Sequence, residues 1–516
     1  MTQLWFFEVA VLVAAACQAT WIMLKPPVWR EVRENPGLML PLLAATAGFG
    51  ALALWAAITW PAVRHVLAAL LMGAMASAWW RARLSYGWRR RWPRGSLGIG
   101  HSLDALNNKR YYLEQAARFG PIFKTSQFGR PVVCMVGLDH ARRLLANHAA
   151  SLASATLPYN RLIPRGLLRY MRPEHHKTIA PLFRTTFSSL TLEPVGPALR
   201  LSYRRALARL AADSSRSEEG VRARPYFERA VLEALALIFY GLGREDPRVT
   251  ELGGWMPSLL MGQSGKPWWR RHTRAGLAGV TTIMRRTQAE WPADPGQGTA
   301  SALRALVASV PNAIDDPTIA GNFILITRIA YGDLTGLHDW VFKFLCDHPT
   351  VLVPLRAAGS AEEAGLGAIP NPATRIVMET LRLEQTEFLY RKIARPIEFE
   401  GLVLPAGWFV RLCTQESHRD PTVFPEPERF DPDRFARRAY SRAEYSPFGA
   451  DAHGCMGSQF ALLLGRILVE ELALGYDWRV VSDGPLERGN RHRHHWRPTS
   501  RLRIVMTPRP AASPIS

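Results

Sequence analysis

The chain has 516 residues, a hydrophobic content of 48% and a formal net charge of +21. Its five cysteines (Cys17, Cys134, Cys346, Cys413 and Cys455) show no paired spacing, which argues against a disulfide framework and a structural zinc site. No nucleic-acid-binding motif accompanies the positive charge, so the charge fits an ordinary basic surface, an anionic membrane face or an acidic protein partner, and not nucleic acid.

The first 90 residues are unusually apolar. Leu4–Leu24 contains Glu8 as its one charged residue, Leu38–Trp60 contains none, and Val66–Trp80 is a shorter apolar run. A helix needs about 20 apolar residues to cross a bilayer. Arginines cluster directly after the third run, and such clusters stay cytoplasmic. We therefore predict a multi-pass membrane anchor of two or three transmembrane or interfacial helices over residues 1–90, with the next domain on the cytoplasmic side.

Residues 91–516 are predicted to form one domain of mixed helices and strands. The extended runs Ile122–Gln127 and Pro131–Val136 have the spacing of a β-hairpin, and residues 395–412 alternate as a small sheet does. Helical periodicity covers the remaining elements. The expected helices are Asn108–Phe119, Asp139–Asn147, Gly196–Ala212, Glu228–Tyr240, Ile319–Asp347 and Met456–Leu474. The expected fold class is mainly α with a smaller β region.

One cysteine lies where chemistry is expected, in the segment Phe448-Gly449-Ala450-Asp451-Ala452-His453-Gly454-Cys455-Met456-Gly457. A cysteine just before a helix has backbone N–H groups and the positive helix end directed at its sulfur, which favours the thiolate that a metal requires. Phe448 would shield the sulfur, and His453 would supply a donor at the edge of a planar ligand. The alternative is a small buried hydrophobic side chain.

Further motifs follow in a fixed order. Glu379-Thr380-Leu381-Arg382 places two opposite charges on one helix face, and His418-Arg419-Asp420-Pro421 and Phe430-Asp431-Pro432-Asp433-Arg434-Phe435 come before the cysteine segment. Together with that segment they resemble the cytochrome P-450 superfamily. The resemblance covers residues 92–507 and is strongest over residues 371–475.

This resemblance implies a P-450 fold and a haem b whose iron is bound by Cys455. In the family, the residues corresponding to Glu379, Arg382 and Arg434 form a buried structural cluster. Around the haem the resemblance places several further residues, although Ala180 stands where the family commonly has a propionate-binding arginine. These cofactor-binding candidates are Phe448, Gly449, His453, Gly457, Arg391 and His176.

The long central helix departs from the family pattern. The family has Ala-Gly-x-Asp/Glu-Thr, in which the acid and the threonine deliver protons to bound oxygen; here the stretch is Ile329-Ala330-Tyr331-Gly332-Asp333-Leu334-Thr335. Asp333 matches, Leu334 occupies the threonine position, and Thr335 comes one residue late, about 100° further round the helix. Either a local bulge re-aims Thr335 or the proton relay is altered. Asp333 and Thr335 are the catalytic candidates, and a solvated helix acid is the alternative for Asp333.

The resemblance implies an O2-dependent monooxygenase that oxidises a lipophilic small molecule. Electrons would come from a separate acidic ferredoxin or flavoprotein reductase, because no flavin or NAD(P) site is present in this chain. A peroxygenase or an isomerase that bypasses O2, and a non-catalytic haem sensor, are the alternatives. The apolar residues between 255 and 269 fit either a substrate entrance or the core; they are Trp255, Met256, Leu259, Leu260, Met261, Trp268 and Trp269.

Overall fold

The computed structural model divides the chain into two compact units. The first contains residues 1–134 and 398–404, and the second contains residues 135–397 and 405–516. Within them the structure describes residues 5–6, 8–13, 36–85, 91–97, 104–105, 108–127, 130–154, 162–259, 267–292, 300–358, 370–384, 389–449, 454–488 and 496–510.

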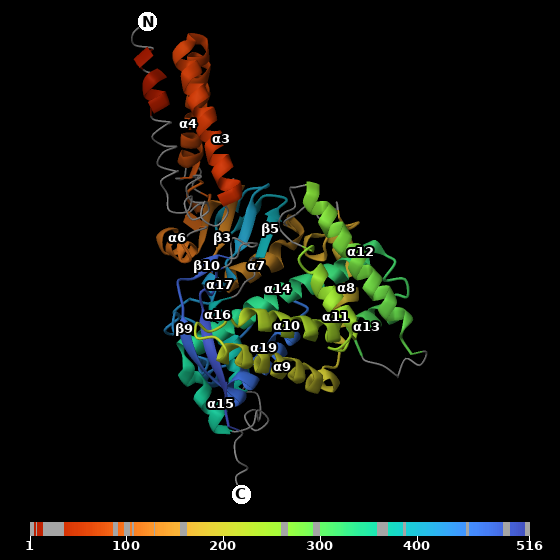
Figure 1. Ribbon diagram of the computed structural model, residues 1–516. Helices are drawn as coiled ribbons and strands as arrows, with labels where there is room; N and C mark the ends of the chain where they lie inside the picture. Colours follow the sequence, from red (N-terminus) through yellow and green to blue (C-terminus); the bar gives the residue numbers. More distant parts are fainter. Residues whose placement is uncertain are drawn as a thin grey trace. The chain divides into compact units, whose positions relative to one another are not determined.

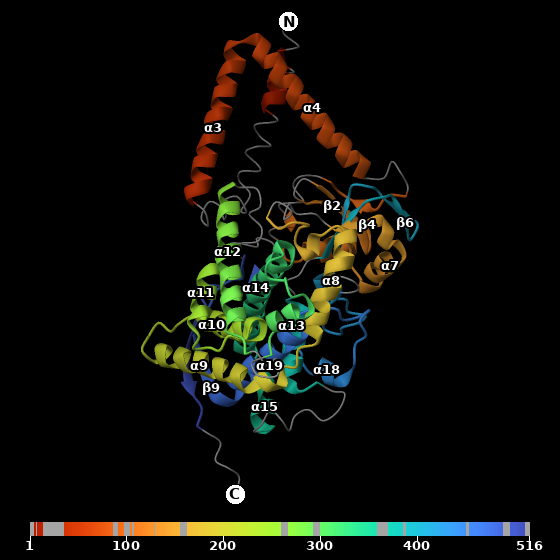
Figure 2. The ribbon, with the colours of Figure 1, turned by 90° about the vertical axis from the view of Figure 1, so that its right-hand side faces the viewer.

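Two long helices dominate the N-terminal part of the first unit (Figures 1 and 2). Helix α3 spans Pro36–Thr59 and α4 spans Pro61–Ser85. Pro61 suits the first turn of α4, where a missing N–H leaves no bond unmade. The other elements of this unit are α6 (Tyr111–Phe119), β1 (Arg94–Gly95), β2 (Ile122–Gln127), β3 (Arg130–Met135), β6 (Ile397–Phe399) and β7 (Leu402–Leu404). Strand β2 lies between β1 and β3, so the two predicted hairpin strands are neighbours.

The structure does not support the predicted membrane spans. Helix α3 covers the second apolar run and α4 the third, whereas Leu4–Leu24 falls largely outside the described residues. Among the helices that the structure describes, none is both long enough and apolar enough to cross a membrane. The multi-pass arrangement expected from the sequence therefore has no support in this part of the chain.

The second unit is mainly helical with small sheets, as the sequence predicted (Figure 1). Its helices before the central helix are α7 (Leu138–His148), α8 (Pro173–Ser188), α9 (Gly196–Ser215), α10 (Arg224–Leu235, continued by a π-turn over Ala236–Tyr240), α11 (Pro247–Trp255), α12 (Pro267–Ala289) and α13 (Ala302–Ser309). From the central helix onward they are α14 (Pro317–Asp347), α15 (Val353–Ala358), α16 (Pro372–Leu383), α17 (Thr414–Ser417), α18 (Arg434–Arg437) and α19 (Ser458–Gly475).

The strands of this unit form short antiparallel pairs. Strand β5 (Leu389–Ile393) lies between β4 (Leu152–Ser154) and β8 (Phe409–Leu412), with Arg391 opposite Ser154 on one side and Val410 on the other. Strand β9 (Tyr476–Ser482) pairs with β12 (Arg503–Pro508), and β10 (Glu487–Arg488) pairs with β11 (Trp496–Arg497).

Helix α14 is the centre of the core, and α10, α12, α16 and α19 pack against it (Figure 1). The Asp316 side chain caps its start by accepting from the N–H groups of Thr318 and Ile319 at 2.7 and 3.1 Å, and Pro317 stands at the first helical position. Twenty of its 31 residues are buried. Tertiary packing on several sides therefore fixes the rotation of α14, and with it the direction of each polar side chain it carries.

Candidate active site

Cys455 lies three residues before α19. Its backbone N–H donates to the Phe448 carbonyl at 2.8 Å, and its Sγ accepts from the Gly457 N–H at 3.3 Å. Gly449 has a φ of +75°, a left-handed conformation that favours glycine in the turn leading to the cysteine. The segment expected to bind haem therefore does present its sulfur at a helix N-terminus. His453 lies outside the described residues.

Cys455 and Asp333 face a common enclosed space. Both residues have exposed surface, yet the surrounding protein raises the pKa of each side chain, with burial as the largest cause. Exposed surface that is still surrounded by protein borders an interior opening and not the outer surface. The charge of Asp333 also raises the pKa of Cys455, so the two groups are close enough to interact. From the sequence, the helix end was expected to favour the thiolate. Burial outweighs the Gly457 N–H, so in the protein alone the pKa of Cys455 lies above its usual value.

One face of α14 borders this space. Ile326, Ile329, Ala330 and Asp333 follow a spacing of three and four residues, which puts them on one side of the helix, and all four are incompletely buried. Burial raises the pKa of Asp333 to about 6, while Arg169 and Arg328 oppose that shift. The enclosed space thus has an apolar wall along α14 that ends in one carboxyl group.

Thr335 does not share that face. It lies two positions after Asp333, which is about 200° of helix rotation. Its side chain is 1% exposed, and its Oγ1 donates to the Tyr331 carbonyl at 2.8 Å, so the hydroxyl is directed back onto its own helix. Helix α14 runs without interruption over Pro317–Asp347, so no bulge turns Thr335 towards the cysteine.

The charges near Asp333 come from two elements. Arg328 precedes it on α14, donates from Nε to the Met256 carbonyl at 3.0 Å and lies over the Tyr331 ring. A β-carbon at Gly332 would meet Arg328 Nη1 at 3.0 Å, so the glycine leaves room for the guanidinium. Arg169 lies in a short 3₁₀ turn, Leu168–Tyr170, and lowers the pKa values of both Asp333 and Cys455.

The segment that carries Arg169 is held firmly against α14. Asn322 is completely buried; its Oδ1 accepts from the Leu168 N–H at 2.5 Å, and its Nδ2 donates to the Gly166 carbonyl at 3.1 Å. Thr318 Oγ1 adds a bond to the Pro164 carbonyl at 3.1 Å. Buried polar atoms that are fully paired hold a loop in one conformation. This contact was not predicted from the sequence, although a lone amide in the apolar first half of the central helix is the signal that points to a buried partner.

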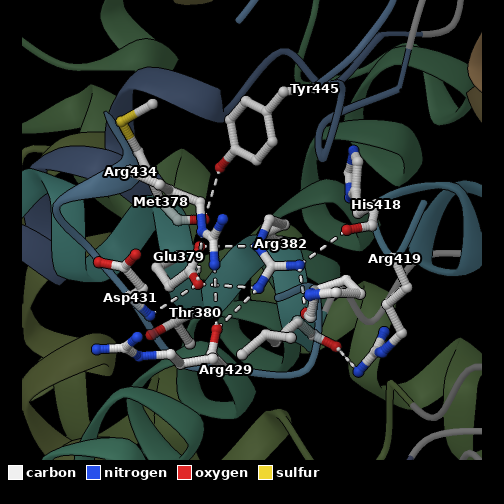
Figure 3. Close-up of polar contacts among 12 residues, drawn as sticks. Met378, Glu379, Thr380, Arg382, His418, Arg419, Arg429, Asp431, Arg434 and Tyr445 are labelled. Carbon is white, nitrogen blue, oxygen red and sulfur yellow. Dashed lines mark hydrogen bonds and ion pairs between the residues drawn. The ribbon is translucent and has the colours of Figure 1, made fainter. Parts of the chain in front are cut away.

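The structure also brings together Glu379, Arg382 and Arg434 (Figure 3). Arg382 donates to Glu379 through Nε at 2.8 Å and Nη2 at 2.9 Å, and Arg434 Nε donates to Glu379 Oε1 at 3.0 Å. The side chains are 0%, 0% and 3% exposed. The N–H of Asp431 donates to the same Oε1 at 2.9 Å. Arg382 also donates to the carbonyls of His418, Pro427 and Arg429.

The residues expected near a haem edge lie on two elements of the second unit. His176 is buried in the first turns of α8, and Arg391 lies on β5. Burial lowers the pKa of His176, and the charges of Arg184 and Arg391 lower it further, so these three groups are neighbours. Ala180 is buried in the core, so that position supplies no cation.

The structure describes some of the apolar residues between 255 and 269. Met256 and Leu259 are buried in the core, and the Trp255 ring lies within 2.3–2.6 Å of the position that a β-carbon at Gly279 would take. These residues therefore belong to packing between α11 and α12. Leu260 and Met261 lie outside the described residues, as do the side chains of Trp268 and Trp269.

A thiolate-bound haem fits this site. The cysteine has exposed surface inside the fold, a backbone donor supports its sulfur, and the charge of Asp333, on an apolar face of α14, acts on it. Cys455 would hold the iron, and the cation of the iron would favour the thiolate over the thiol that burial favours. A haem bound in this way promotes cleavage of O–O bonds and oxidises C–H bonds, which no side chain can do.

Comparisons with known proteins agree with the site. A family model for Cytochrome P450 matches residues 373–500. Abscisic acid 8'-hydroxylase 2 of Arabidopsis thaliana is 26% identical over 451 residues, which cover 81% of this chain and 90% of that protein. An abscisic acid 8'-hydroxylase of Solanum lycopersicum is 25% identical over 444 residues, which cover 79% and 91%. The retinoic acid-bound structure of cyanobacterial CYP120A1 has a TM-score of 0.64 and 22% identity, and covers 79% of this chain and 96% of that one.

The cysteine just before α19, the enclosed space beside α14 and the relatives thus lead to one assignment. The chain belongs to the cytochrome P450 superfamily and is a haem-thiolate monooxygenase.

Proposed function

We propose that the substrate of this monooxygenase is an apolar small molecule with a carboxylate group, and that Arg169 recognises the carboxylate. The main support is that the Arg169 charge lowers the pKa values of both Asp333 and Cys455, so a cation is present beside the enclosed space. A guanidinium is well suited to bind a carboxylate because its planar donors match the two oxygens.

The apolar part of the substrate would lie along α14. Ile326, Ile329 and Ala330 offer it a hydrocarbon wall, and burial of apolar area there would supply most of the binding free energy. Because the hydrogen bonds of Asn322 already hold the Arg169 segment in place, substrate binding would lose less conformational entropy there. Two of the similar proteins have acids in their names: abscisic acid in the plant hydroxylases and retinoic acid in the cyanobacterial structure.

A binding titration tests this proposal. Substrate entry is followed by the change in the haem absorption spectrum, with retinoic acid and retinol as a matched acid and alcohol. We expect the acid to bind about tenfold more tightly than the alcohol, which is about 1.4 kcal/mol. R169Q should remove that preference. R172Q is the control, because Arg172 is 74% exposed and only three residues away.

Two results would contradict the proposal. Equal binding of acid and alcohol by the wild type would remove the carboxylate preference. Loss of haem from R169Q with an unchanged preference would make Arg169 a partner of the haem instead of the substrate.

Proton delivery is proposed to depend on Asp333. Its carboxyl faces the space that Cys455 faces, and a pKa of about 6 lets it both accept and release protons near neutral pH. We infer that Thr335 takes no direct part, because its hydroxyl is buried and bonded to Tyr331. Oxygen-dependent turnover with electrons from a separate protein is thereby favoured over peroxygenase or isomerase chemistry.

The residues proposed to hold the haem are Cys455 through iron, Phe448, Gly449 and Gly457 around the sulfur, and Arg391 and His176 at the propionates, with His453 as a further candidate. The proximity of His176, Arg184 and Arg391 supports a cationic group there. If R391Q retains haem as tightly as the wild type, Arg391 is not a propionate partner.

The electron donor is proposed to be an acidic ferredoxin or flavoprotein reductase, since the formal charge of +21 would attract it. The rate of haem reduction by such a donor should fall as ionic strength rises, because salt screens attraction between surface charges. A rate independent of salt would contradict an acidic partner.

We also propose that the N-terminal helices lie at a lipid bilayer, with the haem-binding unit on the cytoplasmic side. The support is a set of exposed apolar side chains on α3 and α4 that water would disfavour. These are Leu52, Leu54, Trp55, Ile58, Val66, Leu70 and Met75. Sedimentation of the full chain with vesicles of anionic lipid tests this. A chain that stays in the supernatant would contradict it.

A further inference from the structure

Two hydrogen bonds hold the segment that leads to the cysteine, Tyr445–Gly449, one to helix α16 and one to the ring of His418. Tyr445 Oη donates to the Met378 carbonyl at 2.8 Å. The N–H of the next residue, Ser446, donates to His418 Nε2 at 3.0 Å. Figure 3 shows Tyr445 and His418 on the same side of the Glu379–Arg382 pair. The entry to the cysteine loop is therefore fixed from the side of the buried charge cluster.

Short bonds then connect this entry to Cys455. Ser446 Oγ donates to the Gly449 carbonyl at 3.0 Å, and the Gly449 N–H donates to the Ser446 carbonyl at 3.1 Å. Phe448, which lies inside this turn, accepts from the Cys455 N–H at 2.8 Å. A shift of Ser446 would therefore move Phe448 and, with it, the backbone of the cysteine.

The His418 ring is held in one tautomer. It is completely buried, directly follows α17, and packs against the rings of Tyr445 and Phe424 at centroid distances of 5.2 and 6.1 Å. Since Nε2 accepts from Ser446, the proton is on Nδ1, which faces the Arg382 backbone carbonyl without reaching hydrogen-bond geometry. Burial lowers the pKa of His418 to about 3, and the charges of Arg382 and Arg419 lower it further, so the ring is neutral at physiological pH.

The backbone of His418 belongs to the charge cluster as well, because its carbonyl accepts from Arg382 Nη1 at 2.8 Å. One residue thus joins Arg382 through its carbonyl to Ser446 through its ring. We propose that His418 is a positioning residue for the haem ligand: by accepting the Ser446 N–H, its Nε2 transmits the position of the Glu379–Arg382 cluster to the loop that carries Cys455.

The two nitrogens of the ring allow a sharp test on the full-length holoenzyme. In H418Q the amide oxygen can take the place of Nε2 and accept from Ser446, whereas in H418N the shorter side chain reaches only the position of Nδ1. H338N is the control: His338 is also completely buried, and its Nε2 bonds to Tyr203 Oη at 2.7 Å, away from the cysteine loop.

Three quantities are measured: the reduced, CO-bound absorption band that reports thiolate ligation, the haem reduction potential and the urea midpoint of unfolding. We expect H418N to lose the thiolate band about tenfold faster than the wild type and to shift the potential, because a buried N–H is left without an acceptor. H418Q should retain both properties. H338N should lower the urea midpoint while leaving the band and the potential unchanged.

A purely structural role makes a different prediction. If H418N lowers only the urea midpoint, or if H418Q loses the thiolate band as fast as H418N, the proposal is wrong. Should H418N give no folded holoenzyme, amide hydrogen exchange on the wild type and H418Q decides. The Ser446 amide is expected to exchange slowly in both, and rapid exchange in the folded wild type would overturn the proposal.

Discussion

Replacing Glu379 by glutamine would test how much the buried charge cluster contributes to stability. The substitution keeps the shape of the side chain but removes the negative charge that faces Arg382 and Arg434, which are 0% and 3% exposed. Four donors now reach this carboxylate: Nε and Nη2 of Arg382, Nε of Arg434 and the N–H of Asp431. In E379Q one oxygen becomes an NH2 group that faces guanidinium donors.

Breaking a buried ion pair by removing one partner costs about 3–5 kcal/mol, because the remaining charge is left uncompensated. Native proteins are stable by only about 5–15 kcal/mol, so E379Q should lose a large part of that margin. The assay is urea unfolding of the holoprotein, followed by tryptophan fluorescence and by haem absorption, and the expected result is a clear fall in the midpoint.

E426Q provides a matched control. Glu426 pairs with Arg429 at 3.0 Å, but the two side chains are 69% and 64% exposed, so the same change should cost less than about 1 kcal/mol. If E379Q unfolds within about 0.5 kcal/mol of E426Q, the cluster does not stabilise the fold through its charge and the reasoning about buried pairs fails here.

Three further outcomes are expected. D333N should lower the product formed per electron pair consumed by at least about tenfold, because a positioned acid commonly contributes a factor of about 10²–10⁴ to the rate. T335V should change this yield little, and equal effects would contradict the different orientations of the two side chains. G449A should lose about 1–2 kcal/mol of stability in urea because of its φ of +75°, while G457A, with a φ of −101°, should lose less, and the reverse order would refute the argument. The pKa of His338 is lowered to about 4, so between pH 6.5 and 4 the unfolded state binds a proton at this ring that the native state does not. The free energy of unfolding of the wild type should therefore fall by about 3 kcal/mol relative to H338Q as the pH falls over that range. A constant difference between the two proteins would contradict the burial of a neutral ring.

Motifs of fixed order were predictable from the sequence because they reflect local geometry. Glu379 and Arg382 are three residues apart on a helix, so a shared face follows from helix periodicity alone. The position of Arg434 beside them depended on the resemblance, since 52 residues separate it from Arg382.

The rotation of α14 was beyond sequence reasoning. The sequence matched Asp333 to the family pattern but left open whether a bulge re-aims Thr335, and only the uninterrupted, packed helix decides that Asp333 faces the interior space while Thr335 faces its own backbone. Arg169 and His418 were missed as site residues for a similar reason. Each acts on groups that are distant in sequence, and no local pattern marks an arginine or a histidine for such a contact.

Helix α14 also sets a fixed separation between two parts of the site. Asn322, which grips the Arg169 segment, and Asp333 are 11 residues apart, or about 16 Å along the axis. Because both belong to one uninterrupted helix, sliding of α14 would carry the Arg169 segment and the acid together without changing their spacing. An insertion of one residue between them would lengthen that spacing by about 1.5 Å and turn Asp333 by about 100° away from the cysteine. Lineages that adapt this enzyme to longer or shorter molecules are therefore expected to change the side chains around α14 and to preserve the residue count within it.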